Sequence, residues 1–330
     1  MTKKKSARTS RKNHSKAVPV SLPDLTVGAE LVAALDGRWD KFLAQLRRNR
    51  RRCTEPSIHD LRVATRRMIA TLDTVGAVLP DGVPLDVRRK LKRLLKGFNE
   101  MRDLHIQLMH FQALRARFPV VQPFISALRL RERAMVKEAA AAIAEMKTRA
   151  LEQRIAQVAD NLALATAGPE AEQACRAAVF GVLAASFVRA VGLRKCIAPG
   201  DPASIHALRV AFKKFRYTVE ILAPMLPHVG KKQLKRMNAY QTLMGEIQDL
   251  GVVGTVLKMN PPGRFRSMPA SLLPVHQFIT QQRTDLIERF ISSADDLLTF
   301  SQFISWSPYG TLYPSPRGSR PAGKQRLPQR

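Results

Sequence analysis

Apolar residues recur along this 330-residue chain at intervals of three and four, the spacing of amphipathic helices. Two stretches show the pattern most clearly. Their apolar stripes comprise Ile58, Leu61, Thr65, Met68, Leu72 and Val75 in the first, and Ile205, Leu208, Phe212, Phe215, Val219 and Leu222 in the second. Because successive helical residues are about 100° apart, the basic residues between these positions form a separate face. Each stretch therefore predicts a helix with one core face and one cationic face.

The same two stretches repeat one phrase, 147 positions apart. Residues 58–67 are IHDLRVATRR and residues 205–214 are IHALRVAFKK. A second match follows in the same order, because Arg102-Asp103 at the end of residues 91–104 corresponds to Gln248-Asp249 at an offset of 146. Two linked matches indicate an internal duplication.

Helical periodicity on both sides of the repeated phrase predicts an all-α protein built as four helices followed by four more. The helices around the two histidine-containing ones are expected at residues 27–51, 91–104 and 120–164 in the first half and at 171–195, the segment ending at 250, and 270–300 in the second. Ala167-Gly168-Pro169 marks a break between the halves. The expected division is a basic tail (1–26), a first repeat (27–167), a second repeat (168–303) and another basic tail (304–330).

The repeated His-x-x-Arg-x-x-x-Arg/Lys-Arg/Lys helix, together with the Arg102-Asp103 and Gln248-Asp249 ends, resembles the CHAD domain, the conserved histidine α-helical domain. The resemblance covers roughly residues 27–300. It implies two pseudo-symmetric four-helix bundles around a basic channel that binds inorganic polyphosphate. Many relatives carry an attached CYTH domain, whose Glu-x-Glu-x-Lys strand is not found in this sequence, so the chain resembles a stand-alone member.

Charge agrees with a polyanionic partner. The chain has 55 Lys and Arg against 26 Asp and Glu, a net charge of +29, which exceeds what solubility needs. Residues 1–16 hold seven basic side chains and 307–330 hold five, with no acid in either, so 29 − 12 leaves +17 for the body. The tails are rich in Ser, Pro and Gly, and we expect them to be disordered.

Guanidinium, ammonium and imidazole groups on the repeated helices suit phosphate oxygens. The candidate polyphosphate-binding residues are His59, Arg62, Arg66, Arg67, Arg89, Lys92, Arg93, Lys96, Arg102, His206, Arg209, Lys213, Lys214, Arg216, Tyr217 and Lys235. The two histidines either face the ligand, which predicts tighter binding toward about pH 6, or hydrogen-bond locally. Tyr217 either contacts ligand or packs inside. Asp103 and Asp249 either hold a basic side chain or fix helix packing.

Catalysis, metal binding and cofactor binding lack the required residue patterns. The sequence shows no glycine-rich phosphate loop, no paired carboxylate cluster and no nucleophile beside a base. His105 and His110 are five positions apart and fall on different helix faces. The longest apolar stretch is about a dozen residues, around 177–188, and three cysteines show no metal-ligand spacing. We therefore expect a cytoplasmic, non-enzymatic protein with no membrane span and with reduced cysteines.

Two other classes of function remain open. Basic body and tails also suit sequence-independent DNA or RNA binding, although aromatic residues are only 6% and no base-reading motif is present. An interaction protein is the other class, because CHAD proteins resemble components of polyphosphate or polyester storage granules. Attachment to granules would then be indirect, through bound polyphosphate.

Overall fold

A computed structural model of the chain describes residues 26–79, 81, 85–198, 200–226, 229–259 and 269–303. Most of both predicted tails lies outside these residues, and their disorder stays a prediction. The described residues form helices and no strands, which confirms the all-α class. The α-helices are α1 (Val27–Arg51), α2 (Glu55–Val75), α3 (Leu85–Gly97), α4 (Asn99–Leu114), α5 (Gln122–Glu145), α6 (Arg149–Ala165), α7 (Pro169–Lys195), α8 (Pro202–Leu222), α9 (Lys231–Met259) and α10 (Leu273–Ser293).

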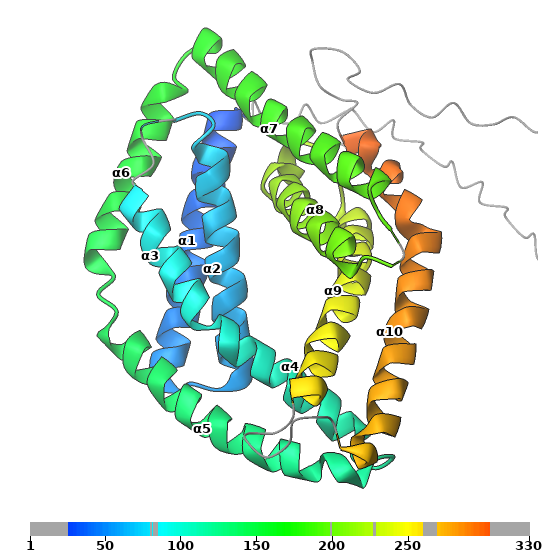
Figure 1. The fold of residues 1–330 in the computed structure, drawn as a ribbon. Helices are drawn as coiled ribbons and strands as arrows, with labels where there is room; N and C mark the ends of the chain where they lie inside the picture. Colours follow the sequence, from blue (N-terminus) through cyan, green and yellow to red (C-terminus); the bar gives the residue numbers. More distant parts are fainter. Residues whose placement is uncertain are drawn as a thin grey trace, which may run out of the picture.

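The two helices that carry the repeated phrase, α2 and α8, pack against each other near the middle of the molecule (Figure 1). In this view α5, α6, α7 and α10 run around the outside, while α1 to α3 lie on one side of the centre and α8 and α9 on the other. Short 3-10 helices, Pro119–Val121, Ala223–Met225, Ala270–Leu272 and Ala294–Phe303, join or extend these elements. The arrangement places the repeated basic phrase of each half at the junction between the halves.

The buried apolar residues form two clusters, and each draws on both halves of the sequence. The larger contains the apolar stripes of α1, α2, α7 and α8, including Phe42, Met68, Phe187 and Phe212. The smaller joins α4 and α5 to the second part of α9 and to α10, for example through Phe111 and Val253. Burial of these faces is the main source of stability in a helical domain. It also holds the two halves against each other.

The expected third helix of the first half is interrupted, so the prediction of one helix over residues 91–104 was wrong. Helix α3 ends at Gly97, the buried Phe98 leaves the helical conformation (φ −94°, ψ 0°), and α4 begins at Asn99. Glycine weakens a helix interior, and the buried Arg62 guanidinium of α2 donates a hydrogen bond to the Phe98 carbonyl. In the second half α9 continues without a break.

The expected fourth helix of the first half, residues 120–164, is divided in the same way. Helix α5 ends at Glu145, Met146 is extended, and α6 begins at Arg149. Arg50 at the end of α1 donates to the carbonyls of Ile143 and Met146. These carbonyls lie in the last turn and the cap, where intrahelical partners run out, so a distant arginine satisfies the end of the helix. In the second half, the expected helix over residues 270–300 is α10 with a 3-10 helix at each end, Ala270–Leu272 and Ala294–Phe303.

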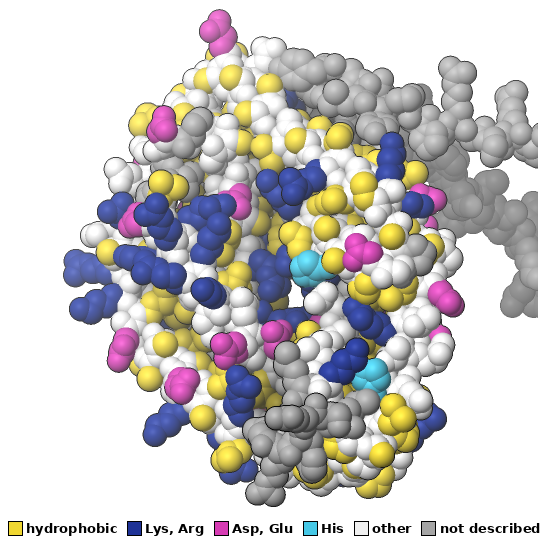
Figure 2. Space-filling model, viewed as in Figure 1, with side chains coloured by type: hydrophobic (Ala, Val, Ile, Leu, Met, Phe, Trp, Pro, Cys, Tyr) yellow, Lys and Arg dark blue, Asp and Glu magenta, His cyan; other side chains and the backbone are white. Residues whose placement is uncertain are grey.

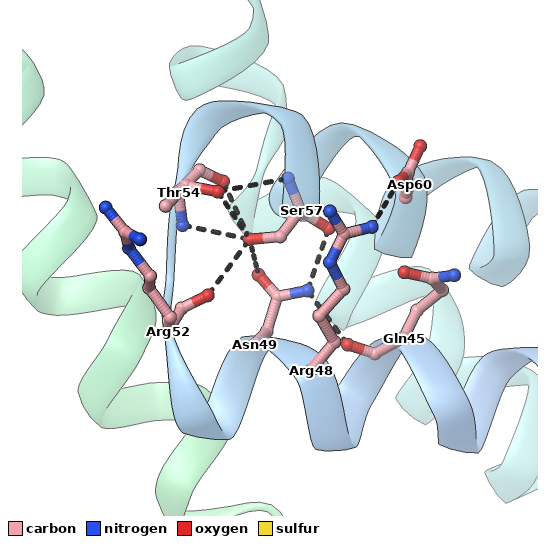
Figure 3. A network of polar contacts seen from close by, with 7 residues as sticks. All are labelled: Gln45, Arg48, Asn49, Arg52, Thr54, Ser57 and Asp60. Atoms are coloured by element: carbon pink, nitrogen blue, oxygen red, sulfur yellow. Dashed lines mark hydrogen bonds and ion pairs between the residues drawn. The ribbon is translucent and has the colours of Figure 1, made fainter.

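A network of polar contacts fixes the start of α2 (Figure 3). The Thr54 hydroxyl accepts from the Ser57 backbone N–H, and the Thr54 N–H donates to the Ser57 hydroxyl, which forms a capping box. The Ser57 hydroxyl also donates to Asn49 of α1 at 2.8 Å, and Asn49 donates to the carbonyls of Gln45 and Ser57. Because Asn49 and Ser57 are buried, this network holds the first turn of α2 firmly against the end of α1.

Helix α7 begins after Gly168, whose φ of +91° favours glycine, at the predicted boundary between the halves. By length and composition α7 is apolar enough to cross a membrane, and among the described helices it alone meets that criterion. Half of its apolar window is buried, and its stripe of Val179, Leu183 and Phe187 packs in the larger core. That pattern is typical of a helix that packs one face against the core of a helical domain.

Candidate functional site

Five cations from both halves meet where α2 and α8 pack together, and we name this group the central cation cluster. It comprises Arg62 and Arg66 of α2, Arg102 of α4, and Arg209 and Lys213 of α8, each close enough to at least two others to perturb a pKa. In Figure 2, dark-blue Lys and Arg side chains are visible inside a hollow between α2 and α8. Sequence reasoning proposed all five residues, and the fold brings them together.

The electrostatic effect of this crowding is large. Burial, then Arg66 and Arg102, lowers the pKa of Arg62 to about 10. Burial, then Arg102, also lowers the pKa of Arg209. For Lys213, burial followed by Arg66, Arg209, Arg102 and Arg216 lowers the pKa to about 7. Desolvation and like charges both disfavour the ionised amine, so Lys213 is only partly charged at neutral pH.

Carboxylates stand at three positions beside the cluster: Asp103 lies 3.6 Å from Arg102 on the same helix, and the other two connect the halves. Asp249 of α9 accepts a hydrogen bond from Arg102 at 3.0 Å. Glu220 of α8 lies 3.2 Å from Arg67 of α2 and also pairs with Arg216. The side chain of Glu220 is 10% exposed, and this burial strengthens its electrostatic contacts. Of the two roles foreseen for Asp249, holding a basic side chain is the one that the geometry displays.

No carboxylate in the described part of the chain forms an ion pair with Arg62, Arg66, Arg209 or Lys213. Moreover, the buried Nε atom of Arg209 has no hydrogen-bond partner among the described residues. A buried donor without a partner costs free energy comparable to a lost hydrogen bond. The cluster therefore carries positive charge that the protein does not itself neutralise, and an anion would supply the missing partners.

The two halves treat their equivalent arginines differently. Arg62 donates to the Phe98 carbonyl, exposed by the break between α3 and α4, and its other nitrogen lies 3.4 Å from the Asn99 Oδ1. The offset of 146 that aligns Asp103 with Asp249 aligns Asn99 with Gly245. Gly245 faces Arg209, since a Cβ there would lie 3.7 Å from its Nε. Because position 245 is glycine and α9 is unbroken there, Arg209 lacks the kinds of partner that Asn99 and the Phe98 carbonyl provide for Arg62. Its N–H donors therefore stay available for an anion.

Cavities flank the cluster on both sides. One of about 660 Å³ is lined by Arg62 and Arg102 together with His59. His105 also faces this cavity, with its Nε2 atom 3.2 Å from Glu132. A smaller cavity of about 190 Å³ lies between α2 and α8 and is lined by Arg66 and Lys213. Cluster side chains are thus reachable from solvent-filled space.

Other sequence-predicted residues are used differently. Arg67 and Arg216 pair with Glu220, and Arg216 also donates to Gln241 and lies 4.8 Å above the ring of Tyr217. Tyr217 is buried, so packing is the role that the structure displays for it, although its edge borders the smaller cavity. These contacts fix the α8 backbone beside the cluster.

The remaining candidates are exposed. His59 borders the larger cavity, whereas His206, at the corresponding place on α8, lines none of the described cavities. Lys214 borders the smaller cavity. The other exposed candidates are Arg89, Lys92, Arg93 and Lys96 of α3 and Lys235 of α9. Figure 2 shows the dark-blue group over α3 as an outer patch, apart from the dark-blue side chains in the hollow.

Sequence reasoning missed three contributors to the site. Glu220 and Arg38 were not singled out, yet Glu220 lies 3.9 Å from Arg38 as well as pairing with Arg67. Glu220 follows Arg216 by four positions, which is the spacing of a helical ion pair and could have indicated it. The Asn99-to-Gly245 difference was visible only through the alignment of the halves.

Comparisons with known proteins agree with this architecture. A model of the CHAD domain family matches residues 33–258. A solved structure described as the CHAD domain from the plant Ricinus communis matches with a TM-score of 0.60 at 17% sequence identity, over 86% of this chain and 93% of that chain. At this sequence identity, the likeness shows the fold alone. A comparison with curated protein sequences found no significant match. Because the family match spans more than half of its length, the chain belongs to the CHAD domain family.

Proposed function

We propose that this protein binds inorganic polyphosphate at the central cation cluster and does so without catalysing a reaction on it. The observation that carries the proposal is the meeting of Arg62, Arg66, Arg209 and Lys213, none of which is paired with a carboxylate among the described residues. Bringing like charges together under partial burial costs free energy. A bound polyanion offsets that cost and supplies hydrogen-bond acceptors to the guanidinium groups.

The geometry favours a chain of phosphates over one phosphate. Arg62 and Arg66 are one helical turn apart on α2, about 6 Å along the axis at about 1.5 Å per residue, and Arg209 and Lys213 repeat that spacing on α8. A polymer with a charge on every unit can contact both helices together. Exposed ion pairs contribute roughly 0 to 1 kcal/mol each, so binding should strengthen as more units engage.

The exposed cations of α3 extend the positive field beyond the cluster. Helix α3 packs against α2, and its outer face carries Arg89, Lys92, Arg93 and Lys96. Long polyphosphate that leaves the cluster can continue over this outer patch. We therefore expect affinity to rise with chain length and to fall steeply with salt, with a log–log slope of about −3.5 if five cluster contacts release about 0.7 counterion each.

Direct competition tests this function. Full-length protein, and protein that lacks residues 1–16, would be titrated with labelled long-chain polyphosphate at physiological salt, with DNA, RNA and pyrophosphate as competitors. Polyphosphate should be preferred by both proteins, and pyrophosphate should compete weakly. If DNA or RNA competes equally well in the full-length protein and loses that ability when residues 1–16 are removed, the basic tail is a nucleic-acid-binding arm. Equal competition in the truncated protein would overturn the proposal.

Association with polyphosphate or polyester granules would follow from the same binding. A fluorescent fusion should then collect on granules in phosphate-rich cells and disperse in phosphate-starved cells. A fusion that carries Arg66→Gln and Arg209→Gln should stay dispersed in both. Retention of that variant on granules would contradict attachment through polyphosphate.

A further inference from the structure

We propose that Lys213 is an acylation site at which small acyl phosphates react, so that acylation of its amine switches off anion binding by the cluster. The inference uses the same cationic side chains but does not require polyphosphate to bind. It rests on the position of the amine at a largely apolar cavity that Arg66 and Lys214 also line.

Access to Lys213 comes from the cavity of about 190 Å³ between α2 and α8. Arg66 lines the same space, and Lys214 stands at its edge. A small anion can enter this space and place its phosphate against the Arg66 guanidinium. Valines from α7 and α8, Val182 and Val210, form part of the wall, which suits a short acyl chain.

The charged and titratable groups around the amine are mostly cationic. Those that perturb Lys213 are Arg66 of α2, Arg102 of α4, and Arg209 and Arg216 of α8. Other ionisable groups on the elements packed around this position are Asp73, Lys214, Tyr217, Asp249, Glu220 and Arg38. Asp73 is held by Arg88, Asp249 by Arg102, and Glu220 by Arg38, Arg67 and Arg216. Each of these described carboxylates is therefore already paired with an arginine, and none of them forms an ion pair with Lys213.

An amine in these surroundings is a nucleophile at neutral pH. Because burial and the four arginines lower its pKa to about 7, about three quarters of Lys213 side chains are neutral at pH 7.5, against about 0.1% for an ordinary lysine. Placement next to other cations is a recognised way to activate a lysine. Lower basicity reduces the intrinsic reactivity of each neutral amine, so we expect a net advantage of roughly tenfold over an exposed lysine.

The reaction balances without any further reagent. The Nζ lone pair attacks the carbonyl carbon of the acyl phosphate, a C–N bond forms, and the C–O bond to phosphate breaks with its electrons passing to the phosphate oxygen. The nitrogen loses one proton, which the departing phosphate accepts to leave as hydrogen phosphate. The arginines bind the phosphate before the reaction and stabilise the negative charge that develops on it. The product amide cannot take up a proton, so the cluster loses the positive charge that Lys213 would otherwise carry against a bound anion.

Acetyl phosphate is the probe, with acetic anhydride as the acylating agent that lacks a phosphate. Peptide mapping by mass spectrometry would follow acetylation of Lys213 against the adjacent Lys214 in full-length protein. With acetyl phosphate at pH 7.5, Lys213 should react roughly tenfold faster than Lys214, and Arg66→Gln should reduce its rate at least threefold. With acetic anhydride, Lys213 should still lead, and the Arg66 substitution should slow it less than it slows the acetyl phosphate reaction, because only the effect of Arg66 on the pKa of the amine is then lost and no phosphate contact.

Two outcomes would overturn the inference. Reaction of Lys213 no faster than Lys214 with both reagents would show that the amine is not activated. An advantage with the anhydride but not with acetyl phosphate would show that the cavity does not recognise the phosphate. Failure of polyphosphate to protect Lys213 while acetylation proceeds would instead count against the proposed polyphosphate function, so the two failures are distinguishable.

Discussion

The pKa of Lys213 makes polyphosphate binding and proton uptake inseparable, which gives a quantitative prediction. In the free protein, burial and four neighbouring arginines hold the pKa near 7. A bound polyanion reverses the electrostatic part of that effect and favours the charged amine. If the pKa returns to about 10 in the complex, the amine is charged in about one free molecule in ten at pH 8 and in nearly every bound one. Binding at pH 8 should then take up about 0.9 proton.

The corresponding change in affinity follows from the same two pKa values. Affinity should fall about fivefold from pH 7 to pH 8 and roughly 45-fold from pH 7 to pH 9, and it should rise only about twofold from pH 7 to pH 6. Isothermal titration calorimetry in two buffers with different ionisation enthalpies measures the proton uptake, at constant ionic strength. Internal phosphates of a long polyphosphate stay fully ionised over this range, so the ligand contributes little to the trend.

Two substitutions separate the contribution of Lys213 from other sources. Lys213→Arg keeps a charge at all these pH values, so affinity should become almost independent of pH between 7 and 9. Lys213→Met removes the charge, so affinity should be low and equally flat. A His59→Ala/His206→Ala variant should keep the decline above pH 7. Persistence of the full pH dependence in both Lys213 variants would refute the reasoning.

Other predictions concern the surroundings of the cluster. The free protein should gain stability from Lys213 as pH rises from about 7 to 10, because in this range the Lys213 amine binds a proton mainly in the unfolded chain. Urea unfolding at pH 7 and pH 9 should show this gain in the wild type and not in Lys213→Met. Gly245→Asn, which recreates the Asn99 of the first half beside Arg209, should leave the fold intact and weaken polyphosphate binding about tenfold, with Gly245→Ala as the control that should bind normally. Glu220→Gln leaves three guanidinium groups without a carboxylate and should reduce the free energy of unfolding by roughly 3 kcal/mol. Asp60→Asn, which removes the carboxylate of the exposed Arg48–Asp60 ion pair, is the control and should cost less than about 1 kcal/mol. Equal losses of stability in the two variants would contradict the role of Glu220.

The positions of most helices follow from local sequence. Apolar spacing located α1, α2, α7 and α8 within a few residues, and Thr54 and Asp201 cap α2 and α8 through their own side chains. The two unexpected breaks depend on long-range partners. Arg62 lies 36 positions from the Phe98 carbonyl, and Arg50 lies 93 positions from the Ile143 carbonyl. Helical periodicity carries no information about such partners.

For the site, the two linked sequence matches were enough to identify the cations but not to separate the cluster residues from the paired and exposed ones. Arg66 and Arg67 are adjacent in sequence, yet Arg66 belongs to the cluster while Arg67 is paired with Glu220, 153 positions away. Likewise, α3 carries six Lys and Arg residues against three on α2, but all except Arg88 are exposed. Burial and pairing depend on how the halves meet, which only the tertiary structure reveals.

The central claim is that the cluster between the halves, and not the overall positive charge, holds the ligand. Two double variants with the same loss of charge test it most directly: Arg66→Gln/Arg209→Gln in the cluster and Arg89→Gln/Arg93→Gln on the outer face of α3. Titration with long-chain polyphosphate at physiological salt should show roughly a 100-fold loss of affinity for the cluster variant, at about 1.5 kcal/mol per charged hydrogen bond. The outer variant should lose less than about tenfold. Equal losses in the two variants would contradict the account.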